Sequence, residues 1–161
     1  MAQLETAWIH RTGVVGNFKA TPLQIGDSLF FCTGGNIITA LDVDTGEERW
    51  RYDPQITGRD AIFWSTCRGV TYYEAPPGTT DTCQARLLTA TTDARMIAVD
   101  AASGEPCSDF GEDGQISLLP GMGEFTPGLY YATSPPTIAS GVAVLGGLVK
   151  DNQEILEPSG V

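Results

Sequence analysis

Two groups of polar residues in this sequence could together bind an anion and a cation. Arg68 lies in the run Thr-Cys-Arg-Gly-Val at residues 66–70, and a planar guanidinium can pair with a carboxylate through two parallel hydrogen bonds. Asp151 and Asn152 follow an apolar stretch, and their oxygens suit a hard cation such as Ca²⁺ or Mg²⁺. Each feature also has a plainer interpretation: Arg68 could form an ordinary ion pair, and Asp-Asn, taken by itself, is better explained as a common turn dipeptide.

The cysteines are the other residues whose side chains could react. Cys32, Cys67, Cys83 and Cys107 show no Cys-x-x-Cys spacing, so a zinc site is not indicated. One or two disulfides formed in an oxidising compartment, or four buried free thiols, would both fit. If bridges form, we expect Cys67 to pair with Cys83, because these two residues bracket one loop of a single repeat unit.

An internal repeat indicates the elements that must position these side chains. Residues 40–47, Ala-Leu-Asp-Val-Asp-Thr-Gly-Glu, recur as residues 98–105, Ala-Val-Asp-Ala-Ala-Ser-Gly-Glu, and apolar strands at residues 29–33 and 87–91 precede them at the same offset. In each copy the aspartate is expected to accept backbone N–H groups in a tight turn, with the glycine at positive φ. The repeat therefore predicts successive meanders of short strands.

Helical periodicity is weak throughout, so the predicted fold class is all-β, and repeated four-stranded sheets indicate the blades of a β-propeller. Because an open row of blades leaves faces uncovered, we expect a fragment of about three blades belonging to one propeller domain. In the third of these units, strands are expected at residues 135–138 and 142–148. The predicted division is the end of a preceding blade at 1–19, with an outer strand at 4–12, a blade at 20–65, a blade with insertions at 66–131, and the start of the next blade at 132–161.

Charge and hydropathy narrow the choice of partners. Twenty acidic residues against nine basic ones give a formal net charge of -11, which repels phosphate backbones, so no nucleic-acid partner is expected. No apolar run is long enough for a membrane helix, and the first residues lack the pattern of a signal peptide. Any export signal or membrane anchor is therefore expected outside this chain.

Three further stretches resemble one branch of a known enzyme family, and the resemblance runs nearly end to end. The repeat that ends at Trp50, Ala-Leu-Asp-x-x-Thr-Gly-x-x-x-Trp, is similar to the one shared by all propellers of the pyrroloquinoline-quinone (PQQ) type, including those that are only scaffolds. Together the stretches are similar to the membrane-bound glucose/quinate/shikimate branch of the PQQ-dependent dehydrogenases. They are Thr-Cys-Arg-Gly-Val at 66–70 with Tyr-Tyr-Glu-Ala at 72–75, Ala-Thr-Thr-Asp-Ala-Arg-Met-Ile-Ala at 90–98, and Thr-Ser-Pro-Pro at 133–136 with Asp-Asn at 151–152 and Glu-Pro-Ser-Gly-Val at 157–161.

The resemblance implies an eight-bladed propeller whose funnel holds PQQ and Ca²⁺ or Mg²⁺, on the periplasmic side of the inner membrane. It implies oxidation of glucose or a related polyol, with hydride passing to PQQ and electrons to ubiquinone. Oxidation of quinate or shikimate, or a non-catalytic PQQ-like scaffold, are the alternatives. The remaining blades, or another copy of the chain, are expected to cover the exposed blade faces. The family's catalytic base maps onto no residue here.

The resemblance also assigns roles to particular residues. Arg68 matches the family arginine that approaches the carboxylates of PQQ, and Thr133 matches a hydroxyl near the cofactor, although Thr-Ser-Pro-Pro could simply begin a strand. Asp151 and Asn152 match the pair beside the metal and the quinone. Trp64 departs from the family's glucose enzymes, which carry a histidine over the quinone ring. An indole can stack on that ring without the imidazole's hydrogen bond, but a local shift in the match, or simple packing, would also explain it. Arg68 and Asp151 are therefore expected to face the propeller axis.

Overall fold

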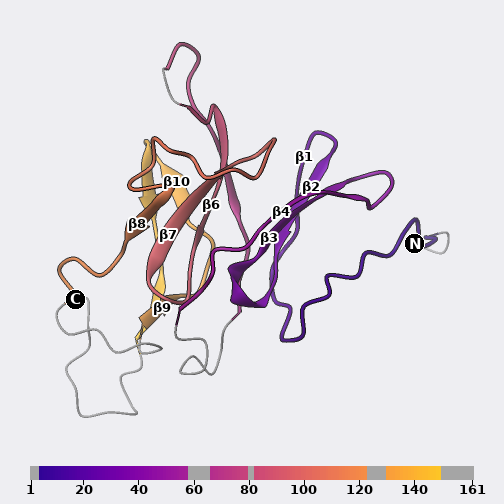
Figure 1. Ribbon diagram of the computed structural model, residues 1–161, viewed down its shortest axis with the longest axis horizontal. Coiled ribbons are helices and arrows are strands. Elements are labelled where there is room, and N and C mark those ends of the chain that lie inside the picture. The colour runs from indigo at the N-terminus through magenta and orange to yellow at the C-terminus, as the bar shows by residue number, and fades with distance from the viewer. Residues whose placement is uncertain (1–3, 58–65, 80–81, 123–129, 150–161) are drawn as a thin grey trace.

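The computed structural model describes residues 4–57, 66–79, 82–122 and 130–149 of the chain. In these ranges the protein is all-β, with one short 3₁₀ turn, η1 (Gly34–Asn36), and no α-helix. Two four-stranded antiparallel sheets are followed along the chain by two pairs of strands (Figure 1). None of the helical structure in the described residues has the length and apolar character needed to cross a membrane.

The first sheet is a meander whose strands lie in chain order. The turn between its first two strands is tight, since Ile25 pairs directly with Ser28 and Gly26 adopts a φ of 58°. This confirms the strand predicted at residues 29–33 to within one residue at each end. The strands are β1 (Leu23–Ile25), β2 (Ser28–Cys32), β3 (Ile38–Asp42) and β4 (Glu48–Tyr52).

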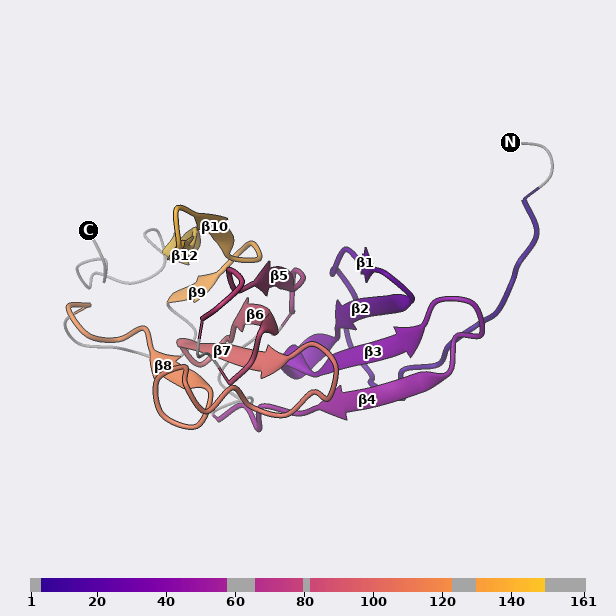
Figure 2. The ribbon, with the colours of Figure 1, turned by 90° about the horizontal axis from the view of Figure 1, so that it is seen from above.

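The second sheet repeats the first, again with its strands in chain order. Figure 2 shows β1 and β5 along one side of the molecule, and β4 and β8 along the other. The first strand of each sheet is therefore on the same side, as expected for successive propeller blades. The strands are β5 (Thr71–Glu74), β6 (Ala85–Ala90), β7 (Arg95–Asp100) and β8 (Gln115–Ser117).

The repeated turn has the predicted chemistry in both sheets. Asp42 Oδ1 accepts the N–H groups of the residues two and three positions on, at 3.0 and 2.9 Å. Asp100 Oδ1 accepts the corresponding two, at 2.9 and 2.8 Å. Gly46 and Gly104 have φ values of 72° and 76°. A hydrogen bond from Arg49, together with the turn's own donors, lowers the pKa of Asp42 to about 2.

An apolar seam joins the two four-stranded sheets. Side chains on one face of β2 and β3 pack against side chains on the facing side of β6 and β7. Fully burying a side chain of this size stabilises the fold by about 1.5–3 kcal/mol, so the seam is a large part of the described core. Its central members are Phe30, Ile38 and Ala40 from the first sheet and Leu87, Ile97 and Val99 from the second.

Trp50 closes the outer edge of this seam. It extends from β4 across to the turn of the second sheet, where Nε1 donates a hydrogen bond to the Ala101 carbonyl oxygen at 3.2 Å. The indole lies so close to Gly104 that a Cβ there would be 2.5 Å from a ring carbon. Only glycine therefore fits under the ring, which explains the glycine in terms of packing as well as of turn geometry.

Trp8 makes the same pair of contacts one unit earlier in the chain. Its Nε1 donates to the Val43 carbonyl oxygen at 3.0 Å, and a Cβ at Gly46 would be 2.5 Å from its ring. The strand expected at residues 4–12 is not formed, because this segment pairs with no neighbouring strand in the described residues. Its tryptophan nevertheless occupies the position relative to the first sheet that Trp50 occupies relative to the second.

The strands that follow the second sheet differ from the expectation. The hairpin of β10 (Thr137–Ala139) and β11 (Val142–Val144) lies close to the predicted positions. A continuous strand over residues 142–148 is wrong, because the chain leaves the hairpin at Leu145 and Gly146. It then forms β12 (Gly147–Val149), which pairs with β9 (Tyr130–Ala132).

All four cysteines are oxidised, so the free-thiol alternative is excluded, but the predicted Cys67–Cys83 bridge is wrong. The disulfides are Cys32–Cys67 and Cys83–Cys107, with Cα–Cα distances of 5.8 and 5.6 Å. Cys67 Sγ lies 3.6 Å from Thr89 Oγ1, near the end of β6, whereas Cys83 precedes the start of that strand. Six residues of extended chain correspond to ~20 Å, so the two cysteines lie at opposite ends of one hairpin.

We expect Gly104→Ala to lower the free energy of unfolding by more than Gly26→Ala does. Both glycines have positive φ, at 76° and 58°, so each alanine suffers backbone strain of about 1–3 kcal/mol. Only at Gly104 would the new methyl group also displace an indole, since nothing lies within 4 Å of a Cβ at Gly26. Urea unfolding of the full-length protein measures both values. Equal losses would contradict the packing of Trp50 on Gly104.

Peptide mapping without reduction should recover Cys32 linked to Cys67 and Cys83 linked to Cys107. The reason is geometric, since both observed Cα–Cα distances lie in the range that a disulfide requires. Free thiols should be alkylated before digestion to prevent exchange. Recovery of a peptide that joins Cys67 to Cys83 would contradict the structure.

Candidate functional site

Arg68 lies just before β5, the first strand of the second sheet, and its side chain is exposed. Its carbonyl oxygen accepts a hydrogen bond of 3.4 Å from the Thr21 N–H, which precedes β1. Within the described ranges Arg68 forms no ion pair, so the ordinary ion pair considered for it is not seen there. The guanidinium therefore lies at the end of the molecule where the first strands of the two sheets begin.

Gly69, the next residue, lies where three units of the fold meet. Its φ is 148°, and a Cβ there would lie 2.9 Å from Pro135 Cγ and 3.6 Å from the Thr21 carbonyl oxygen. Thr89 Oγ1 of β6 donates a hydrogen bond to the Gly69 carbonyl oxygen at 3.0 Å. The segments leading into β1, β5 and β10 thus meet around a glycine that has no room for a side chain.

Thr133 belongs to the third of these segments. It directly follows β9, is half-buried, and donates its N–H to the Gly146 carbonyl oxygen at 3.1 Å. Two residues further on, Pro135 lies against Gly69, and the Pro136 carbonyl oxygen accepts a hydrogen bond from the Thr71 hydroxyl. The fold therefore brings the segments that contain Thr133 and Arg68 beside each other.

The other three candidate residues, Trp64, Asp151 and Asn152, lie outside the described residues. Their assignments, and the expectation that Asp151 and Arg68 face one cavity, stay predictions. Of the candidate set, the structure describes one exposed cation, Arg68, and one half-buried hydroxyl, Thr133. These groups could bind an anionic ligand through charge and hydrogen bonding.

The motif at residues 90–98 contributes an ion pair that the sequence analysis did not foresee. Arg95 binds Asp93 through both carboxylate oxygens, at 3.0 and 2.7 Å. Arg95 also donates to the Pro54 carbonyl oxygen at 2.9 Å, and Asp93 accepts from the Thr57 N–H at 3.0 Å. Burial raises the pKa of Asp93, but the hydrogen bond from Arg95 and others outweigh it, so this pKa lies below the ordinary 3.8. The pair ties the chain that leaves the first sheet to the second sheet.

Asn36 is a second polar tie across the seam. Its Nδ2 donates to the Ala90 carbonyl oxygen at 3.0 Å, and its Oδ1 accepts from the Thr92 N–H at 3.3 Å. The residue is 1% exposed and has a φ of 58°, a conformation that asparagine tolerates better than most side chains. The only local sequence signal at Asn36 is its position in Gly-Gly-Asn. This pattern predicts a turn but does not predict a hydrogen-bond partner in the other sheet.

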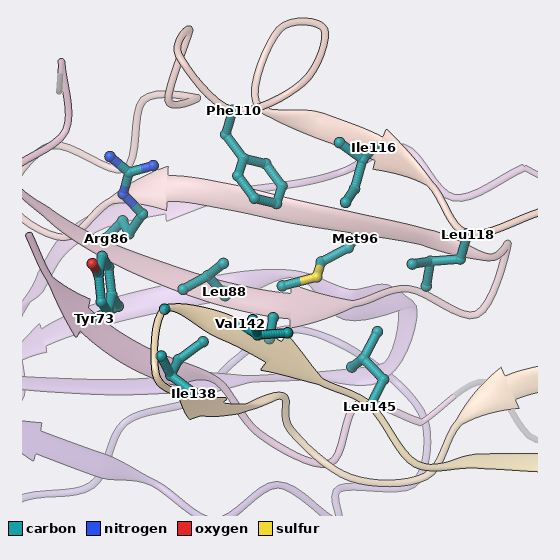
Figure 3. A pocket seen from close by; sticks show the side chains of 12 residues that line it. Tyr73, Arg86, Leu88, Met96, Phe110, Ile116, Leu118, Ile138, Val142 and Leu145 are labelled. Carbon is teal, nitrogen blue, oxygen red and sulfur yellow. The ribbon is translucent and has the colours of Figure 1, made fainter.

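An apolar pocket of about 490 Å³ lies between the second sheet and the β10–β11 hairpin (Figure 3). Arg86 lies at one end of it, paired with Asp109 at 2.9 Å. Leu88 and Met96 hold the positions that Phe30 and Ile38 hold in the first sheet, so the pocket is the second seam of the fold. It is not the candidate site, because neither Arg68 nor Thr133 lines it. Its apolar wall includes Leu88, Met96, Ile116, Ile138, Val142 and Ala143.

Comparison with known proteins relates the whole chain to one protein family. The family model for the β-propeller domain of PQQ glucose/ethanol/alcohol dehydrogenases matches residues 1–161. A quinoprotein glucose dehydrogenase of Escherichia coli is 37% identical over 98% of the chain and 22% of its own length. A glycerol dehydrogenase large subunit of Gluconobacter oxydans is 37% identical over 99% of the chain and 23% of its own length. A quinate/shikimate dehydrogenase (quinone) of Acinetobacter baylyi is 37% identical over 100% and 22%.

Solved structures show the same fold. A quinohemoprotein alcohol dehydrogenase from Pseudomonas putida superposes with a TM-score of 0.61 at 21% identity, over 81% of this chain and 17% of its own. BamB from Moraxella catarrhalis superposes with a TM-score of 0.50 at 21% identity, over 78% and 33%. The chain spans about a fifth of the length of the curated relatives it matches.

We expect Asp93→Asn to lower the free energy of unfolding at pH 7 by about 1.5–3 kcal/mol, the range for a hydrogen bond to a charged group. Because the pKa of Asp93 is lowered in the folded protein, its contribution is present above pH 3.8 and is lost as the pH falls below that value. The difference between wild type and variant should therefore shrink in acid. Urea unfolding of the full-length protein at several pH values measures it.

Asp44→Asn provides the matched control, since it makes the same substitution at an exposed turn residue. It should change the free energy of unfolding little at any of these pH values. A difference between wild type and Asp93→Asn that stays constant down to pH 2 would contradict the ion pair.

Proposed function

We propose that the protein containing this chain is a quinoprotein dehydrogenase that oxidises glucose or a related polyol. The premise is that the chain belongs to the β-propeller family of PQQ glucose/ethanol/alcohol dehydrogenases. The observation that carries this proposal is the placement of Arg68, exposed where the leading segments of three successive units meet. The chain spans about a fifth of its relatives, so the reaction is assigned to the whole protein.

The described residues fit PQQ by charge. A chain with a formal net charge of -11 repels anionic ligands in general, so a bound quinone carboxylate needs a local cation. Arg68 supplies one and would pair with a carboxylate of PQQ, while Thr133 would offer its hydroxyl nearby. When bound, PQQ supplies the acceptor for the hydride taken from the substrate.

The remaining assignments rest on the match of motifs. We assign Asp151 as a ligand of Ca²⁺ or Mg²⁺, which prefer carboxylate and carbonyl oxygens. Asn152 is assigned as a contact of the cofactor beside that metal. Trp64 is assigned as an aromatic contact of the quinone, since a flat indole can stack on a ring.

We place the whole protein on the periplasmic side of the inner membrane, with ubiquinone as the electron acceptor. Both disulfides support an oxidising compartment such as the periplasm. The quinate/shikimate relative carries the word quinone in its name, which supports a quinone acceptor here.

The remaining blades of the propeller are the proposed partners of the chain's uncovered surfaces, with another copy of the chain as the alternative. Leu4 and Ile9, near the start of the described residues, are 83% and 75% exposed. Val142 and Val144 of β11 are 61% and 54% exposed. Apolar side chains in such number at both ends of a row of sheets favour further sheets there.

The relatives are named for three different alcohol substrates. Glucose, glycerol and quinate/shikimate relatives are each 37% identical to the chain, so identity does not favour one of them. A non-catalytic PQQ-like scaffold, the alternative from another class, is favoured by none of these three relatives, which are all named as dehydrogenases. The dehydrogenase proposal therefore takes precedence, with quinate or shikimate as the second substrate class.

The test uses the full-length apoprotein with PQQ, Ca²⁺ or Mg²⁺, and an artificial dye as electron acceptor. We expect dye reduction that requires both PQQ and the metal, with glucose, glycerol or quinate as donor. The 161-residue chain alone should give no turnover, since the base that accepts the hydroxyl proton maps onto none of its residues.

Three results would contradict parts of this proposal. PQQ binding without turnover of any of the three donors would refute the substrate class. Absence of PQQ binding by a folded full-length protein would favour the scaffold. Turnover by the 161-residue chain alone would refute its assignment as one part of the active propeller.

A further inference from the structure

Arg68 directly follows a cysteine whose disulfide crosses between the two sheets. Cys32 ends β2 of the first sheet, and Cys67 precedes β5 of the second. Both sulfur-bearing residues are buried, at 0% and 3% exposed, and their Cα atoms are 5.8 Å apart. The backbone at Arg68 is therefore covalently fixed, one residue away, to a strand of the neighbouring sheet.

The residue on the other side of Arg68 is also fixed. Thr89 Oγ1 of β6 holds the Gly69 carbonyl oxygen at 3.0 Å, and Pro135 lies against the Gly69 backbone. The hydrogen bond of Arg68 itself, from the Thr21 N–H at 3.4 Å, is long and hence weak. The position of Arg68 thus depends on its two neighbours more than on its own bonds.

The Arg68 side chain, by contrast, is exposed. A flexible backbone beneath an exposed guanidinium would have to be ordered when the ligand binds, which weakens binding. A backbone clamped on both sides removes that part of the cost and holds the Cα from which the guanidinium extends in one place. The disulfide is thus placed where it can affect recognition as well as stability.

We propose that the Cys32–Cys67 disulfide is a positioning element for Arg68: it preorganises the guanidinium for an anionic cofactor carboxylate. Thr89 supports the same clamp from the side of Gly69. This inference rests on the proposed role of Arg68 in binding PQQ. Reduction of this one bridge should weaken PQQ binding even while the protein stays folded.

The second disulfide supplies a matched control. Cys83–Cys107 joins the segment before β6 to the segment after β7, so it lies within the unit of the second sheet. Cys83 lies at the end of β6 away from Thr89 and the Arg68 clamp. Loss of this bridge also removes one disulfide bond from the protein, but it leaves the residues on either side of Arg68 unchanged.

A double-mutant cycle on the full-length apoprotein tests the inference. The variants are Arg68→Gln, the pair Cys32→Ser with Cys67→Ser, and their combination, and the measurement is the PQQ Kd by fluorescence titration below all unfolding temperatures. We expect Arg68→Gln to weaken binding about tenfold or more in the bridged protein, as for loss of a charge-assisted pair. Without the bridge the same substitution should cost only about twofold, because the two changes are coupled.

The control cycle replaces Cys83 and Cys107 with serine. There the PQQ Kd should stay within about twofold, and Arg68→Gln should retain its full effect, since distant changes add independently. Additive losses in the Cys32/Cys67 cycle, or an unchanged Kd without that bridge, would overturn the inference. If Arg68→Gln leaves the Kd of the bridged protein unchanged, the proposed cofactor role of Arg68 fails instead.

Thr89→Val keeps the inference testable if the variant without the bridge does not fold. This substitution preserves shape and the disulfide but removes the hydrogen bond to Gly69. We expect the PQQ Kd to rise severalfold and the effect of Arg68→Gln to shrink in this background. A folded Thr89→Val variant with an unchanged Kd would overturn the clamp.

Discussion

The second sheet must bury both of its faces, and the rest of the described structure depends on that constraint. In β7, Ile97 and Val99 pack toward the first sheet, while Met96 and Ala98 belong to the cluster that includes the β10–β11 hairpin. Strands covered on both sides read as continuous apolar runs instead of alternating ones. Such a sheet is stable only within a row of sheets, which is what a propeller provides.

Polar ties at the seam determine how the sheets fit together. Trp50 can reach its carbonyl partner only because Gly104 leaves space for the ring, and Asn36 satisfies two backbone groups of the neighbouring sheet. Apolar contact alone would allow the sheets to slide, whereas paired donors and acceptors in a low-dielectric seam favour one alignment. The Asp93–Arg95 pair extends the same alignment to the connecting loop.

The candidate site lies at the ends of the strands, next to the first seam, whose cluster includes Cys67 and Val70. Arg68 and Thr133 are placed by segments leading into strands or following them, which the seams hold in position. One motif that resembles the enzyme family, at residues 90–98, acts in this structure through the Asp93–Arg95 tie. Residues that match the family can therefore serve the fold, by tying the chain that leaves one sheet to the next sheet.

The sequence by itself determined the all-β class, the repeated meanders, the aspartate turn at Asp42 and the family, because turn chemistry and strand periodicity are encoded within a few neighbouring residues. It also named Arg68 as a candidate, through its chemistry and the resemblance, and Thr133 through the resemblance alone. Only the tertiary structure decided which cysteines pair, what Asn36 binds, and that the leading segments meet at Gly69. Each of these joins residues far apart in the chain, so each depends on how one sheet packs on the next.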